Sequence, residues 1–211
     1  MRNFFTYLQK LIDLILPRDQ DLVKLREMRP EDAALLFKPN VESPPRYVRA
    51  LYSYRDPLIK KLVWHMKFKE CQWVAELFGE MLAQHISGEN FPSKTLLIPV
   101  PIHTKRRRER GYNQCEWLCE SIIKKCTADF LEYKPNIVTR DIYTVKQSWS
   151  DKATRQSNIQ NVFLVKDSEK VRGRNVIIID DVCTTGATLD EMRRTLLAAG
   201  ALSVRAFVIA H

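Results

Sequence analysis

The chain has 211 residues, of which 45% are hydrophobic and 28% are charged, and its formal net charge at pH 7 is +9. These proportions are typical of a soluble globular protein with one main core, and they exclude an intrinsically disordered chain. One of the longest apolar runs, residues 96–102, has seven residues, whereas a transmembrane helix needs roughly 20. We therefore expect a cytoplasmic protein without a membrane span, and the positive charge favours anionic partners such as phosphates or nucleic acid.

Residues 1–45 are predicted to form a small helical lobe with a linker, ahead of a larger domain over residues 46–211. The linker is the proline-rich stretch at residues 38–45. Polar residues interrupt the apolar start of the chain, which favours an amphipathic helix over a targeting segment. The apolar residues at helical spacing are Phe4, Phe5, Leu8, Leu11, Ile12 and Ile15.

The next part of the chain alternates between helical and strand patterns. Apolar residues recur at helical spacing in residues 58–68 and 73–86, which predicts two helices joined by a short turn. The run "TLLIPVPIH" predicts a strand, and we expect the basic segment after it to be a loop. A further helix is predicted over residues 112–126.

Five cysteines without a CxxC pair do not form the pattern of a disulfide framework or a zinc ribbon. Cys115, Cys119 and Cys126 share one face of the predicted helix at residues 112–126 with apolar residues. Core packing is the favoured interpretation of these cysteines, with a metal site as the alternative. We predict no zinc site.

The carboxyl-terminal part is predicted to contain strands at "NIVTR", "VFLV", residues 176–179 and "SVRAFVIA". The polar stretch of about twenty residues before "VFLV" is typical of a functional or mobile loop. A helix is expected over residues 189–199, with Thr188 and Glu191 at capping-box spacing and Gly200 at its end. This alternation predicts an α/β fold with a mostly parallel sheet flanked by helices.

Two carboxylates, Asp180 and Asp181, directly follow the predicted strand at residues 176–179. The loop after them offers three hydroxyl groups and several backbone amides at a helix amino terminus, which favours a bound phosphate. Paired carboxylates can accept hydrogen bonds from a diol or hold a divalent cation. The pattern therefore suggests a ribose 5-phosphate site, and the alternative is that the carboxylates only cap the strand and the helix.

The stretch "VIIIDDVCTTGAT" resembles the signature of type I phosphoribosyltransferases, which bind phosphoribosyl pyrophosphate (PRPP) with Mg²⁺. The resemblance implies that Asp180 and Asp181 are catalytic residues that contact the ribose hydroxyls and hold Mg²⁺ through PRPP. It also implies that the 5-phosphate lies against Thr184, Thr185, Gly186, Ala187 and Thr188.

Two further segments resemble the ComF family of phosphoribosyltransferase-like competence proteins. They are "IPVPIHTKRRRERGYNQCEWL" and "KQSWSDKATRQSNIQNVFLV", and the likeness covers residues 47–211. It implies a pyrophosphate loop near the first segment and arginines that contact phosphate. The residues that would bind PRPP in these two segments are Val100, Pro101, His103, Arg107, Arg110 and Arg155. The four-cysteine zinc module common in this family is missing, because no cysteine precedes Cys71.

The resemblance implies transfer of a phosphoribosyl group to an unidentified acceptor with release of pyrophosphate. The loop at residues 143–161 would then close over the site as a lid. The alternative is a non-catalytic PRPP sensor, or a protein that handles single-stranded DNA during competence through its basic segment. The sequence identifies neither the acceptor nor a general base, and it leaves the oligomeric state open, a homodimer included.

Overall fold

The computed structural model describes residues 20–42, 44–89, 91, 94–126, 130–140 and 162–211. The chain divides into two compact units, one that ends at Leu36 and one that runs from Phe37 to His211. The first unit contains α2 (Gln20–Glu27) and α3 (Pro30–Ala34). The predicted helix at residues 4–15 lies outside the described residues.

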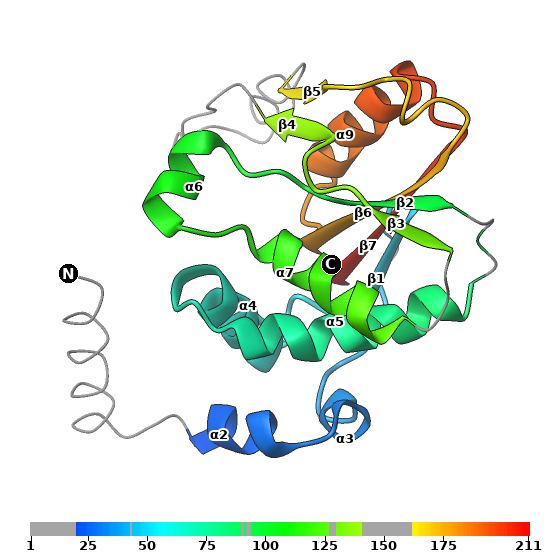
Figure 1. Ribbon diagram of the computed structural model, residues 1–211. Helices are drawn as coiled ribbons and strands as arrows, with labels where there is room; N and C mark the ends of the chain where they lie inside the picture. The colour runs from blue at the N-terminus through cyan, green and yellow to red at the C-terminus, as the bar shows by residue number, and fades with distance from the viewer. Residues whose placement is uncertain (1–19, 43, 90, 92–93, 127–129, 141–161) are drawn as a thin grey trace. The chain divides into compact units, whose positions relative to one another are not determined.

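The second unit is built on a parallel sheet of five strands (Figure 1). The strands lie in the order β1 (Val48–Tyr52), β7 (Ser203–Ala210), β6 (Asn175–Val182), β2 (Thr95–Pro99) and β3 (Leu131–Tyr133). The predicted α/β fold with a mostly parallel sheet is confirmed. The apolar pattern does not predict the edge strands β1 and β3, because both are short and largely half-exposed.

Helices cover both faces of the sheet. Figure 1 shows α4 (Pro57–Phe68), α5 (Gln72–Ser87) and α7 (Gln114–Lys125) on one side and α9 (Ala187–Ala198) on the other. On the α9 side, Met192 and Leu196 pack in one core cluster with Val176 and Ile178 of β6. No helix among the described residues is long and apolar enough to cross a membrane.

A small antiparallel pair lies outside the main sheet. It consists of β4 (Val138–Arg140) and β5 (Phe163–Val165), with Thr139 opposite Leu164. The predicted loop between them falls on residues 141–161, which lie outside the described residues.

The basic segment after β2 is a helix, α6 (Thr104–Arg110), and not the predicted loop. His103 caps it by accepting a hydrogen bond from the backbone N–H of Lys105 at 3.0 Å, and Gly111 ends it at φ +85°. Arginine and lysine are good helix formers, but this helix has no buried residue. Apolar periodicity therefore could not reveal it.

Two boundaries around the predicted phosphate loop also differ from expectation. Strand β6 continues through Asp180 and Asp181 to Val182, so the carboxylates belong to the strand and not to the loop. The predicted capping box is wrong, because α9 begins after Gly186 and its cap makes no side-chain hydrogen bond. Gly200 does follow the end of α9 in the left-handed conformation, at φ +93°.

Candidate functional site

The site begins with the two carboxylates at the carboxyl end of β6. Asp181 is 3% exposed, and both of its oxygens have partners. Oδ1 forms an ion pair with Nζ of Lys67 from α4 at 2.8 Å, and Oδ2 accepts a hydrogen bond from Nε2 of Gln114 at 2.7 Å. Burial disfavours the charge of Lys67, but attraction by Asp181 and Asp180 outweighs it, so the pKa of Lys67 is raised.

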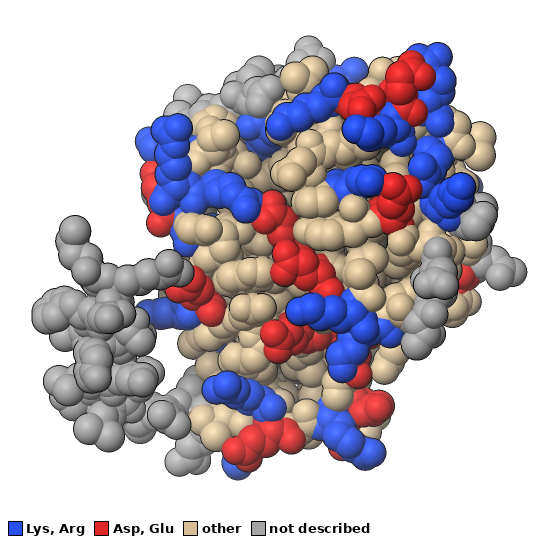
Figure 2. Space-filling view, in the orientation of Figure 1, with Lys and Arg blue, Asp and Glu red and all other residues tan. Residues whose placement is uncertain are grey.

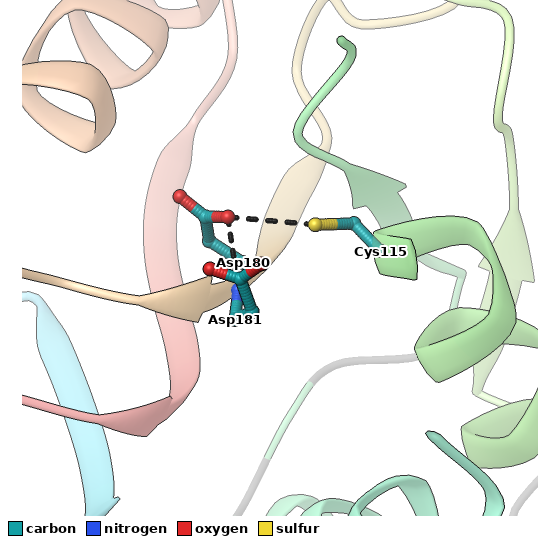
Figure 3. Close-up of side chains that lie close together, drawn as sticks. All are labelled: Cys115, Asp180 and Asp181. Atoms are coloured by element: carbon teal, nitrogen blue, oxygen red, sulfur yellow. Dashed lines mark hydrogen bonds between the residues drawn. The ribbon is translucent and has the colours of Figure 1, made fainter. Parts of the chain in front are cut away.

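Asp180 lies in a different environment (Figure 3). Its Oδ1 accepts hydrogen bonds from the backbone N–H of Asp181 at 2.9 Å and from the thiol of Cys115 at 3.4 Å. Burial, reinforced by the charge of Asp181, raises the pKa of Asp180 to about 7. Burial and the nearby carboxylates also raise the pKa of the Cys115 thiol, so this cysteine stays protonated at neutral pH.

The donor groups at this end of β6 fit a hard divalent cation. Ligand atoms of Cys115, Asp180 and Asp181 all lie within 4.8 Å of one another. Carboxylate oxygens suit Mg²⁺, whereas a thiol suits softer metals. Because Lys67 already pairs with Asp181, Asp180 is the carboxylate whose ionised form a cation or a diol would stabilise most.

The loop between β6 and α9 contains the predicted phosphate-binding residues. Thr184 and Thr185 are exposed, and Gly186 adopts φ +80° immediately before the helix. A β-carbon at Gly186 would lie 3.3 Å from Cγ of Pro45, in addition to the strain of that backbone conformation. The loop therefore presents hydroxyls and backbone amides at the amino terminus of a twelve-residue helix.

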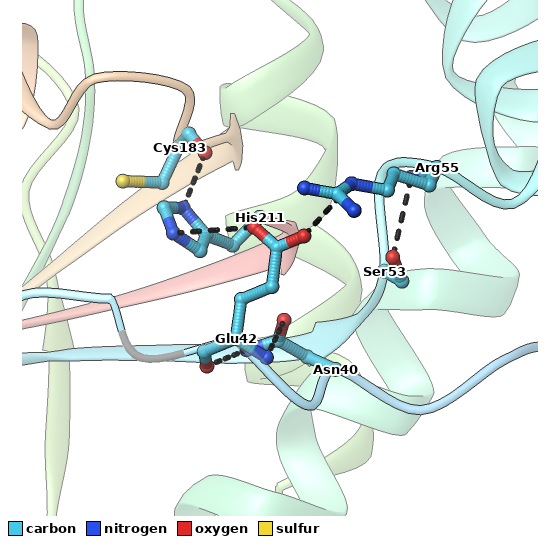
Figure 4. A network of polar contacts seen from close by, with 6 residues as sticks. All are labelled: Asn40, Glu42, Ser53, Arg55, Cys183 and His211. Carbon is cyan, nitrogen blue, oxygen red and sulfur yellow. Dashed lines mark hydrogen bonds and ion pairs between the residues drawn. The ribbon is translucent and has the colours of Figure 1, made fainter.

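The carboxyl terminus of the chain holds the start of this loop (Figure 4). His211 donates its Nδ1–H to the carbonyl of Cys183 at 2.8 Å, and its Nε2 lies 4.0 Å from a carboxylate oxygen of Glu42. Arg55 pairs with the other oxygen of Glu42 at 2.9 Å. Residues far apart in the sequence thus fix the backbone from which the threonines project.

The segment after β2 lies beside the carboxylates. The backbone N–H of Val100 donates to the carbonyl of Ile179 at 2.9 Å, which continues the pairing of β2 with β6. Asn113 donates its side-chain amide to the carbonyl of Val100 at 3.1 Å and caps α7 through the N–H of Cys115. This explains the "NQ" of the motif, since Asn113 ties α7 to Val100 and Gln114 bonds Asp181.

A cavity of about 720 Å³ opens at this edge of the sheet. Six predicted site residues line it, and they are Val100, Pro101, Arg110, Asp180, Asp181 and Thr188. The others in the described part of the chain are not among its lining residues, namely His103, Arg107, Thr184, Thr185, Gly186 and Ala187. Arg155 lies outside the described residues.

Two of the predicted residues outside the cavity have structural partners. His103 caps α6, and Arg107 pairs with Glu116 at 2.5 Å. Figure 2 shows basic side chains gathered at the place of α6 in Figure 1. From this helix Arg106 and Arg110 line the cavity, whereas Arg108 is exposed.

The sequence analysis missed several lining residues. Lys67 and Phe68 end α4, Arg140 ends β4, and Tyr112 donates its hydroxyl to the carbonyl of Met66 at 3.0 Å. Lys67, Phe68 and Arg140 lie outside the motifs, whereas Tyr112 directly precedes the "NQ" of the first family segment. Only the packing of α4 against the rest of the unit brings Lys67 to Asp181, 114 positions later in the chain.

Comparison with known proteins agrees with this architecture. Residues 136–211 match the phosphoribosyl transferase domain family. The chain is 28% identical over 177 residues to the DNA utilization protein YhgH of Escherichia coli (strain K12), covering 80% of this chain and 74% of the relative. It is 32% identical over 166 residues to the competence protein ComFC of Bacillus subtilis, and this match covers 78% of this chain and 64% of the relative.

A third relative carries the family name directly. It is the competence protein F of Haemophilus influenzae, which is 28% identical over 163 residues and matches over 75% of this chain and 69% of its own length. The chain is therefore a homologue of the ComF competence proteins, and its residues 136–211 match the phosphoribosyl transferase domain family.

Proposed function

We propose that this protein binds PRPP with Mg²⁺ and transfers the phosphoribosyl group to an acceptor, with release of pyrophosphate. One observation carries the proposal. The Asp180–Asp181 pair lies near the carboxyl end of β6 and lines a cavity of about 720 Å³, one short loop before the amino terminus of α9. A ribose 5-phosphate carries both a diol, which the carboxylates can bond, and a phosphate, which amides at a helix amino terminus favour.

Each part of the site has a task in this reaction. The amides and hydroxyls of residues 184–188 hold the 5-phosphate, and Asp180 and Asp181 accept hydrogen bonds from the ribose hydroxyls. Arg106, Arg110 and Arg140 line the cavity and offset the charge of the departing pyrophosphate. Mg²⁺, when bound with PRPP, supplies further neutralisation of the same charge.

A second candidate function rests on α6 and on the names of the relatives. The six residues from Lys105 to Arg110 include five cations, and relatives are called competence and DNA utilization proteins. A protein that senses PRPP without turnover, or that binds single-stranded DNA along α6, would use the same residues. DNA affinity that falls steeply with salt would favour this candidate.

The decisive experiment measures PRPP binding and pyrophosphate release separately. Calorimetric titration with PRPP and Mg²⁺ should show binding to the wild-type protein, and a panel of bases and amines should then be screened for pyrophosphate release. We expect Asp180→Asn to lower turnover by about a hundredfold or more, because a positioned carboxylate is lost. Asp167→Asn is the matched control, since Asp167 pairs with Lys170 away from the cavity.

Two results would overturn the proposal. The first is no calorimetric signal for PRPP with the folded wild-type protein. The second is an Asp180→Asn variant that binds PRPP and releases pyrophosphate like the wild type. PRPP binding without turnover for any acceptor would instead favour the sensor.

A further inference from the structure

A tyrosine hydroxyl from the start of β1 contacts the first turn of α9. Tyr47, which directly precedes β1, donates its hydroxyl to Oδ1 of Asp190 at 2.5 Å, across 143 positions of the chain. The backbone of Tyr47 is itself fixed, because its carbonyl accepts a hydrogen bond from the N–H of Ala206 in β7 at 2.8 Å. The sheet therefore holds Tyr47 against the turn that contains Asp190.

Asp190 lies beside the loop that would hold the 5-phosphate. Its backbone N–H donates to the carbonyl of Gly186 at 2.8 Å, and its Oδ2 lies 3.6 Å from the position that a β-carbon of Gly186 would take. The first amides of an α-helix have no partner within the helix, and the cap residue of α9 supplies no side-chain hydrogen bond. A carboxylate within reach of these amides competes with a bound phosphate, because a helix amino terminus attracts both anions.

The carboxylate of Asp190 is engaged outside the cavity. Neither Tyr47 nor Asp190 is among the residues that line the cavity, whereas Thr188 of the same turn is. Burial raises the pKa of the Tyr47 hydroxyl, and the hydrogen bond to Asp190 raises it further, so this hydroxyl remains a donor at neutral pH. The guanidinium carbon of Arg193 lies 4.9 Å from the centre of the Tyr47 ring, which fixes the ring from the same helix.

We propose that Tyr47 is a positioning residue for the loop at residues 184–188, and that its hydroxyl keeps the Asp190 carboxylate from occupying the amides to which a phosphate binds. This proposal rests on the proposed function and deepens it, because it states what keeps the loop open for a phosphate monoester. Without the hydroxyl, Oδ1 of Asp190 loses its donor. The amides at the start of α9 are then available to it as donors.

The charge of Asp190 also acts through space. A phosphate bound to the amide of Gly186 would lie within about 10 Å of the Asp190 carboxylate, which is the Debye length at 0.1 M salt, so the repulsion between the two anions is only partly screened. A hydroxyl that donates to the carboxylate offsets part of this charge. Tyr47 therefore raises the affinity for phosphate by two routes, and both depend on the carboxylate of Asp190.

The test is a double-variant cycle with Tyr47→Phe and Asp190→Ala, measured by calorimetric titration with inorganic phosphate and with PRPP and Mg²⁺. We expect Tyr47→Phe to weaken the binding of both ligands by roughly 2- to 5-fold, the range for one carboxylate at a helix amino terminus. Asp190→Ala should strengthen binding by a similar factor. Adding Tyr47→Phe to Asp190→Ala should change nothing further, because no carboxylate is left for the hydroxyl to hold.

Tyr52→Phe is the matched control for loss of a tyrosine hydroxyl. Tyr52 ends β1, and its hydroxyl contacts Sδ of Met81 at 3.3 Å and not α9, so this variant should bind phosphate like the wild type. Two results would overturn the proposal. The first is phosphate binding that Tyr47→Phe leaves unchanged. The second is an equal loss from Tyr47→Phe with and without the Asp190 carboxylate, since the hydroxyl would then act only on the stability of the loop.

A second measurement decides the role of Tyr47 independently of the proposed function. If the wild type binds neither phosphate nor PRPP, the proposed function fails on its own. Solvent-exchange NMR of the backbone amides of residues 186–189, without ligand, then still tests the positioning role. We expect slower exchange in Tyr47→Phe than in the wild type, because the released carboxylate accepts hydrogen bonds from these amides, and no slowing in the double variant. Unchanged or faster exchange in Tyr47→Phe would refute the proposal.

Discussion

Asp180 is harder to ionise in the folded protein than in water. Its pKa rises from an ordinary 3.8 to about 7, chiefly because it is buried and secondly because Asp181 carries a like charge. Carboxylates that bind a diol or a cation often lie close to a second carboxylate, because the bound ligand then relieves the repulsion between the two charges. In the unliganded protein the same pair of charges lowers the free energy of unfolding.

Asp180→Asn should therefore stabilise the unliganded protein at alkaline pH. Between about pH 4 and pH 7 the folded state holds a proton at Asp180 that the unfolded state has lost, so its contribution to the free energy of unfolding falls as pH rises through this window. We expect the variant to exceed the wild type by about 1–3 kcal/mol at pH 8 and to differ little near pH 4. Urea unfolding at both pH values measures this.

The Asp167→Asn variant serves as the control for that experiment. Hydrogen bonding to Lys170 lowers the pKa of Asp167, so its loss should not stabilise the protein at pH 8. An Asp180→Asn variant that is less stable than the wild type at pH 8 would show that burial does not strain this carboxylate.

Helices α5 and α7 approach each other closely at Gly79. A β-carbon there would lie 2.3 Å from Cβ of Ser121, well inside van der Waals contact. Ser121 also donates its hydroxyl to the carbonyl of Glu76 at 3.0 Å. Because α7 carries Gln114 and Cys115 at its first turn, this approach sets the position of two residues that touch the acid pair.

Gly79→Ala should destabilise the fold by about 1–3 kcal/mol, the usual cost of overpacking a dense contact. Adding Ser121→Gly should recover part of that loss by making room. The matched control is Gly88→Ala, since Gly88 has φ −75° and its nearest contacts would be 3.6 Å away. Equal effects of the two alanines in thermal unfolding would show that the close approach at Gly79 does not decide the result.

The whole molecule carries nine net positive charges, and five cations fall between Lys105 and Arg110. The helix that bears them is exposed on most of its surface. Net charge favours any anion, so it does not by itself select PRPP or nucleic acid. The salt dependence of binding distinguishes a defined phosphate-contact surface from general attraction.

If single-stranded DNA binds along α6, replacing Lys105 and Arg108 by alanine should reduce the slope of log affinity against log salt by about 1.4, or 0.7 for each lost phosphate contact. The control removes two charges elsewhere, with Lys170→Ala and Arg172→Ala on exposed positions paired to Asp167 and Glu169. Fluorescence anisotropy over a salt series gives both slopes. If the slope changes equally in both double variants, α6 makes no specific contact with DNA.

The elements of the fold differ in how far local patterns predicted them. Strand β6 and helices α4, α5 and α7 carry continuous apolar periodicity, and each appears near its expected bounds. Helix α6 has no buried face, so no periodic signal marks it. The capping-box prediction failed at α9 because Gly186, with its positive φ, starts the helix two residues earlier.

The sequence by itself determined the alternation of strands and helices, the acid pair at the end of β6 and the threonine–glycine turn after it. All of these depend on neighbours within a few positions. Only the tertiary structure decided the strand order and the cavity, where Lys67, Phe68 and Arg140 meet the carboxylates. The physical reason is that these residues are brought together by the packing of α4 and β4 against the rest of the unit, and such long-range contacts leave no periodic trace in the local sequence.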